Sequence, residues 1–228
     1  MDEMAERFAR DTAGHELILL RDDGPYRHLR FGQALSHRIK DRRPNLGSFY
    51  WFDLVTWPGS LAINGDCGSF TFSRVQDMFE FFRDGARWGI NPGYWAEKVR
   101  AADPSGVKRY SPELFRKLVA EYIGECGGDW PGLAEAVEDK IFGEFAEWNT
   151  EYVEGAHEAL NDFRHGADPL AGEPGFSFAD SWEWDLTDWN WQYLWCCHAI
   201  QWGISQYDKQ KAPAAGRVTA GTLEASNA

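Results

Sequence analysis

The sequence predicts an α+β fold in which an N-terminal antiparallel β-meander packs against a larger C-terminal helical part. The first observation is that residues 47–73 alternate aromatic or β-branched segments with short turns, which is typical of a meander. The second is that apolar residues beyond position 73 recur at helical spacing instead. We therefore expect three or four strands within about 27–73 and helices within about 74–208, together forming a single domain over 1–208.

The strands are marked by their composition and by the turns between them. Residues 49–55, FYWFDLV, are as aromatic and branched as a buried strand. Pro58 and Gly59 fit the central positions of a type II turn, because proline presets a negative φ and glycine accepts a positive one. The other expected strands are 61–63, 69–72 and, as an additional edge strand, RHLRF at 27–31.

Helical periodicity marks most of the remaining chain. Ser73 lies three residues before Gln76, which is a capping-box spacing ahead of an apolar run. Ser111 and Pro112 give the clearest helix start, with serine at the N-cap and proline in the first turn. The expected helical segments are a short one within 2–20 and others at about 75–82, 91–103, 112–126, 131–141, 144–163 and 188–207, followed by a flexible tail at 209–228.

The formal net charge of −13 is concentrated in one block of the chain. Residues 121–190 carry eighteen acidic and two basic side chains, and such a field repels nucleic acid and attracts basic partners, unless it is only a solubilising face. Within this block, residues 144–163 show a helical pattern with opposite apolar and acidic sides. The apolar side consists of Phe145, Trp148, Tyr152, Val153, Ala156, Ala159, Leu160 and Phe163. The acidic side, here called the acidic ridge, consists of Glu144, Glu147, Glu151, Glu154 and Glu158.

Residues 182–203 hold six of the twelve tryptophans, and a helical wheel of this region has two apolar faces. A helix that is apolar on two sides is either sandwiched in a core or presents one side to a partner. We expect a central core helix. Its second face, here called the aromatic stripe, becomes a candidate partner or ligand surface if it is exposed, and it contains Trp191, Trp195, His198 and Trp202.

The residue types that most often carry chemistry do not assemble into a site. Glu154 and His157 form a single E-x-x-H, whereas a di-iron bundle needs two such motifs. Cys196 and Cys197 precede His198, but neighbours on a helix diverge by about 100° and no matching ligand pair stands out. We therefore expect no catalytic residues, no metal site and no cofactor, while carbohydrate chemistry by acids among the tryptophans stays open.

The sequence also favours a cytoplasmic protein with no membrane partner. No apolar run approaches the ~18 residues of a membrane helix, and residues 1–11 lack the basic and apolar regions of a secretory signal. The basic run at 37–43 is short and has no interleaved aromatic residues, so direct nucleic-acid binding is not expected.

Three stretches of the chain resemble a family of uncharacterised proteins from bacteriophages, prophages and other mobile elements. They are YWFDLVTWPG at 50–59, FSRVQDMFEFF at 72–82 and WCCHAIQWGISQYD at 195–208. The resemblance extends over about 27–208 and identifies no catalytic residues. It implies an accessory phage gene product that acts in the cytoplasm of a bacterial host.

That context favours interaction over chemistry. We expect a non-enzymatic protein that binds and inhibits a host or defence protein with a basic surface, as anti-CRISPR and anti-restriction proteins do. The acidic ridge would occupy a nucleic-acid groove, because its charges would repeat about every 4.5–6 Å along a helix, close to the spacing of DNA phosphates. The alternative is an aromatic-lined small-molecule pocket, in either an enzyme or a sequestering module.

Overall fold

The computed structural model describes residues 3–33, 49–85, 89–126, 130–146, 148–167 and 175–212. The chain folds into two compact units. The sheet unit comprises Met1–Pro104 and Trp191–Ala228, and the helical unit comprises Ser105–Asn190. The antiparallel sheet followed by helices confirms the predicted α+β class. A single domain over 1–208 stays a prediction.

A six-stranded antiparallel sheet forms the centre of the sheet unit, in the spatial order β1-β2-β3-β4-β5-β6. Because neighbours in the sheet are also neighbours in sequence, this is the predicted meander with six strands instead of three or four. The strands are β1 (His15–Asp23), β2 (Tyr26–Gln33), β3 (Phe52–Trp57), β4 (Ser60–Gly65), β5 (Gly68–Ser73) and β6 (Val99–Ala102).

The two edge strands, β1 and β6, lie where the sequence predicts helix. The helix expected within 2–20 ends at residue 11, and the one expected over 91–103 is limited to Pro92–Ala96. The predicted edge strand at 27–31 lies in β2, which is an interior strand paired on both sides. A run of consecutive apolar residues such as that in β1 fits a strand and a helix equally well, so periodicity does not separate the two.

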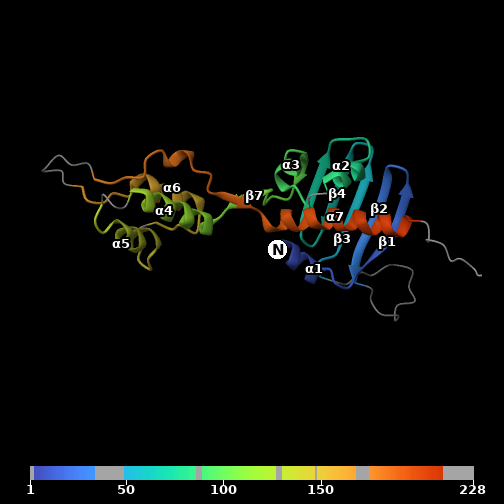
Figure 1. The fold of residues 1–228 in the computed structure, drawn as a ribbon, viewed down its shortest axis with the longest axis horizontal. Coiled ribbons are helices and arrows are strands. Elements are labelled where there is room, and N and C mark those ends of the chain that lie inside the picture. The colour runs from blue at the N-terminus through green and yellow to red at the C-terminus, as the bar shows by residue number, and fades with distance from the viewer. Residues whose placement is uncertain are drawn as a thin grey trace, which may run out of the picture. The chain divides into compact units, whose positions relative to one another are not determined.

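Helix α7, Trp191–Lys211, packs across one face of the sheet (Figure 1). Nine of its residues are buried, among them Tyr193, Trp195 and Ile200, as expected for a core helix. A Cβ atom on Gly203 would lie 2.7 Å from Leu54 Cδ1 and 3.1 Å from the ring of Phe31, so glycine permits the close approach to β2 and β3. The helix extends three residues into the predicted tail, whose residues 213–228 lie outside the described part of the chain. Neither α7 nor any other helix of the described ranges has the length and apolar character to cross a membrane.

Two shorter helices pack against α7. Phe8 of α1 lies against Trp195 and Trp202, with ring centroids 5.1 and 5.9 Å apart. Phe79 of α2 lies 5.4 Å from the ring of Tyr207. Since α7 contacts the sheet and two helices, its two apolar faces are both used within the sheet unit. The other helices of this unit are α1 (Glu3–Asp11), α2 (Met78–Gly85) and α3 (Pro92–Ala96).

Helix α2 begins later than predicted because Asp77, not Ser73, forms its N-terminal turn. The Asp77 carboxylate accepts a hydrogen bond from the Phe79 amide at 3.0 Å, whereas the Ser73 hydroxyl donates to the Gly59 carbonyl at 2.6 Å. Arg27 donates two further hydrogen bonds to Asp77, at 2.9 and 2.8 Å. The same carboxylate therefore caps α2 and ties it to β2.

The helical unit has a core of its own, in which Phe115, Leu160 and Phe163 are buried. Ser111 caps its first helix as predicted, since its hydroxyl accepts a hydrogen bond from the Leu114 amide at 3.0 Å. The elements are β7 (Lys108–Tyr110), α4 (Pro112–Cys126), α5 (Leu133–Val137), the π-helical turn η2 (Glu138–Phe142), α6 (Val153–Asp162), the 3-10 turn η3 (Ser181–Glu183) and β8 (Thr187–Trp189). Strands β7 and β8, which pair with each other, are too short to show an alternating pattern.

One buried asparagine joins the two ends of the helical unit. The Asn190 side-chain amide donates to the Ser105 hydroxyl and to the Gly106 carbonyl, both at 2.9 Å. The Asn190 backbone amide donates to the Val107 carbonyl at 3.0 Å. The helical unit is thus an insertion in the chain of the sheet unit, closed where it begins and ends.

Helix α6 has ten residues, so the helix predicted over 144–163 is wrong in its first half. The Asn149 side chain accepts a hydrogen bond from the Glu151 amide at 3.2 Å, a local bond that competes with helix formation. A Cβ atom on Gly155 would lie 2.1 Å from the Asn149 carbonyl oxygen. The chain before α6 therefore folds back onto the first turn of the helix, and glycine makes that approach possible.

We expect Gly155→Ala to lower the free energy of unfolding by about 1–3 kcal/mol, because the added methyl group meets backbone that cannot move aside. The matched control is Gly124→Ala in α4, where a Cβ atom meets nothing within 4 Å. That change is expected to raise stability by about 0.5–1 kcal/mol through helix propensity. Urea unfolding of the full chain, followed by circular dichroism, measures both, and equal effects of the two substitutions would contradict the close approach at residue 155.

Candidate functional site

The net charge of the protein lies entirely in the helical unit. Ser105–Asn190 contains nineteen acidic and six basic residues, a net charge of −13, whereas the rest of the chain contains seventeen of each sign. The sheet unit is therefore formally neutral. Electrostatic attraction for a basic partner is a property of the helical unit alone.

Several cations of the helical unit are engaged within it. Lys108 pairs with Asp185 at 2.8 Å, and Arg116 pairs with Glu138 at 3.1 Å. Arg164 donates to two backbone carbonyls at 2.7 Å. By contrast, the following glutamates are exposed and take part in no ion pair among the described residues: Glu144, Glu151, Glu154 and Glu158.

The segment between η2 and α6 carries two of these glutamates and is held by hydrogen bonds. The Tyr110 hydroxyl donates to the Thr150 carbonyl at 2.6 Å. Burial, together with the charges of Glu151 and Glu113, raises the pKa of Tyr110 to about 12. The hydroxyl therefore stays protonated at neutral pH and keeps the segment in place.

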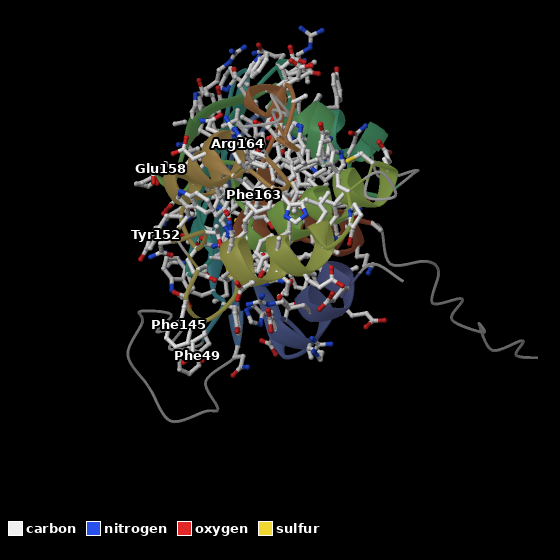
Figure 2. The ribbon with its side chains drawn as sticks, turned by 90° about the vertical axis from the view of Figure 1, so that its left-hand side faces the viewer. Phe49, Phe145, Tyr152, Glu158, Phe163 and Arg164 are labelled. Atoms are coloured by element: carbon white, nitrogen blue, oxygen red, sulfur yellow. The ribbon has the colours of Figure 1, made fainter. Side chains whose placement is uncertain are left out.

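Large aromatic side chains are exposed beside these charges. Phe145 is 90% exposed and Tyr152 is 64% exposed. In Figure 2 both lie at the outer edge of the helical unit, as Glu158 does, whereas Phe163 is buried. Exposed aromatic residues with neighbouring charges are typical of interface hot spots. The acidic aromatic surface is defined here as Glu144, Phe145, Glu151, Tyr152, Glu154 and Glu158.

The acidic ridge is not a ridge on one helix. Glu154 and Glu158 lie one turn apart on α6, but Glu144 and Glu151 lie on the segment before it, and Glu147 lies outside the described residues. The prediction that these glutamates repeat regularly along one helix, and so imitate the spacing of DNA phosphates, is therefore wrong. The predicted apolar side is correct in its second half, where Ala156, Ala159, Leu160 and Phe163 are buried, and at Trp148, which is partly buried against the same core.

The aromatic stripe is covered by α1. Trp195 is fully buried, and its indole nitrogen donates to a carboxylate of α1 at 3.0 Å. His198 and Trp202 pack against Phe8, and their ring centroids lie 6.0 and 5.9 Å from the centroid of the Phe8 ring. Trp191 lies under a guanidinium of α1, 4.0 Å from its ring centroid. Of the stripe, Trp195 is therefore core, whereas Trp191, His198 and Trp202 are partly exposed.

The thiols next to the stripe are buried in the sheet unit. Burial raises the pKa of the Cys196 and Cys197 thiols well above its ordinary value, and it raises the pKa of Cys67 to about 12. Protonated thiols are poor nucleophiles and poor metal ligands. In the described ranges, no three His, Cys, Asp or Glu side chains are grouped so that they could hold a metal ion.

The exposed aromatic residues are the candidates that sequence analysis misses, because periodicity places Phe145 and Tyr152 on a core-facing side. The signal that separates them is the Asn149–Thr150 pair, since asparagine and threonine favour turns over helix interiors. Trp182, which is 69% exposed, follows a Pro/Gly loop and has no local signal of its exposure.

Members of the aromatic stripe that differ in burial should differ in their contribution to the free energy of unfolding. Trp195→Ala is expected to lower the free energy of unfolding by about 3–5 kcal/mol, because it empties a fully buried site. Trp191→Ala is expected to cost about 1 kcal/mol or less, since it removes a partly exposed cation–π contact. Thermal and urea unfolding measure both, and similar losses for the two variants would contradict this placement.

No protein-family model, no curated protein and no solved structure matches the chain. Its function has to be inferred from its own residues.

Proposed function

We propose that the protein is a non-enzymatic binding protein whose helical unit docks on a basic, nucleic-acid-binding surface of a host or defence protein and inhibits it. The observation that carries the proposal is the segregation of charge, with −13 in Ser105–Asn190 and formal neutrality elsewhere. Charge that served only solubility would not need to be confined to one compact unit. A confined charge gives that unit a strong field, which speeds association with a basic partner and weakens with salt.

The exposed aromatic residues support binding beyond long-range attraction. Interfaces gain most of their affinity from a few aromatic or arginine anchors that become fully desolvated. Phe145 and Tyr152 supply such anchors, because each exposes more than half of its surface in the free protein. Glutamates beside them would pair with lysine or arginine at the rim of the partner's pocket, which adds specificity and speed of association.

The class of partner follows from the charge and from the resemblance to phage accessory proteins. The grooves of nucleases and other nucleic-acid-binding proteins are large positive surfaces, to which an acidic unit is attracted. Occupation of such a groove blocks nucleic acid by competition. Since the glutamates are not regularly spaced on one helix, the competition depends on charge density and aromatic anchors instead of a copy of the phosphate spacing.

The test is a pull-down with the full chain from lysates of bacteria that carry restriction or CRISPR systems, followed by mass spectrometry. We expect capture of a basic nucleic-acid-binding protein, with the amount retained falling about tenfold or more between 50 and 300 mM salt. The partner, purified on its own, should then lose nucleic-acid binding or cleavage when the chain is added. A captured partner that retains full activity would contradict inhibition.

Two matched charge-reversal variants locate the surface. Replacing Glu151, Glu154 and Glu158 by lysine should abolish capture, because it changes the helical unit by six charges. The control makes the same change at three exposed glutamates of the sheet unit, which are Glu6, Glu16 and Glu97. We expect the control to capture the partner as the wild type does. Equal capture by both variants would remove the acidic aromatic surface from the function.

A further inference from the structure

The sheet unit contains a cavity of about 520 Å³ between α1, α2 and α7. Cavities of roughly 300–1,000 Å³ are the usual size of small-molecule sites. Part of the aromatic stripe lines it, so the stripe is not used up by core packing. The lining residues on which the site depends are Ala5, Phe8, Phe82, Gln201, Trp202 and Ser205.

The walls of the cavity are aromatic and held in place by the core. Phe82 is buried and packs edge-on against Phe72 and Trp95, with ring centroids 5.4 and 4.9 Å away. Phe8 is also buried and meets Trp202 edge-on at 5.9 Å. Rigid aromatic walls favour a flat, apolar ligand, because ring edges and faces can pack on it without reordering side chains.

The described lining of the cavity includes one guanidinium, one carboxylate and the imidazole of His198. Arg83 and Asp208, which both line it, bind each other through two hydrogen bonds at 2.9 and 2.5 Å. The two charges therefore cancel, and a charged ligand would have to compete with this pair. Gln201 and Ser205 add an amide and a hydroxyl, which can donate to and accept from a ligand's polar edge.

We propose that this cavity binds a neutral, planar, aromatic small molecule with a polar edge. The ligand's faces pack among Phe8, Phe82 and Trp202, and its polar edge bonds with Gln201 and Ser205. The sheet unit thereby acts as a ligand-binding module, and this role is independent of partner binding by the helical unit.

A second cavity of the same unit, of about 680 Å³, does not share this chemistry. It is lined by the exposed side chains of Arg74, Val75, Glu80 and Tyr94, with few buried walls. Its lining is therefore more polar than that of the cavity beside α7, whose described charges are paired with each other.

The test uses the full chain and the fluorescent probe 1-aminoanthracene, which is neutral, planar and carries one hydrogen-bonding group. We expect a saturable rise in probe fluorescence at one site per chain, together with a rise in the melting temperature of the protein. The matched anionic probe is anthracene-1-carboxylate, which we expect to bind about tenfold or more weakly because Arg83, the guanidinium of the described lining, is already paired with Asp208.

Two tryptophan substitutions on the same helix locate the site. Ala5→Trp fills the cavity and should weaken 1-aminoanthracene binding by about tenfold or more. Ala9→Trp places the same side chain on the exposed side of α1 and should leave binding within about twofold of the wild type. Circular dichroism and the melting temperature verify that both variants fold.

Three outcomes would overturn the proposal. The first is that 1-aminoanthracene shows no saturable binding to the wild type. The second is that it binds folded Ala5→Trp and the wild type equally. The third is that the wild type has equal affinity for the two probes. If Ala5→Trp does not fold, Ser205→Phe replaces it, because a phenylalanine at residue 205 of α7 also obstructs the cavity. It should weaken 1-aminoanthracene binding by the same factor. None of these outcomes depends on capture of a protein partner, so the two proposals fail separately.

Discussion

The close packing of α7 on the sheet is the constraint on which the rest of the sheet unit depends. Gly203 has no side chain, and the space that a Cβ atom would take is filled by Leu54 and Phe31. Because α7 then lies close to the strands, its outer side can receive Phe8 from α1 and Phe79 from α2. The cavity beside α7 is bounded by these same helices, so its walls owe their position to the helix and the sheet together.

The parts of the fold that could be predicted are those with local signals. Strands β3, β4 and β5 are separated by tight turns whose residues identify them, and Gly59 does adopt the positive φ, 81°, that the turn requires. The N-cap at Ser111 is equally local. The edge strands depend on pairing with distant segments, of which a single sequence contains no sign. The break before α6 has one local signal, the Asn149–Thr150 pair, but the approach of Asn149 to Gly155 has none.

The candidate site was predictable in its charge but not in its shape. Counting residues identifies the acidic block, yet the boundaries at Ser105 and Asn190 become visible only because the chain returns to the sheet afterwards. Phe145 and Tyr152 have the same residue types and spacing as core positions, so exposure cannot be assigned to them without the turn that separates them. The two apolar faces of α7 predict a core helix but leave the burial of the stripe open, and the cavity next to it requires three helices in their places.

The insertion of the helical unit sets an order of events during synthesis. All residues of that unit, up to Asn190, leave the ribosome before α7 does, so a nascent chain can complete the inserted part while the sheet still lacks its central helix. Until Trp191–Lys211 emerges, the apolar face of six strands has no cover and is open to aggregation. The negative charge of the folded helical unit would then keep nascent chains apart by repulsion. This protects the uncovered sheet from aggregation until α7 docks.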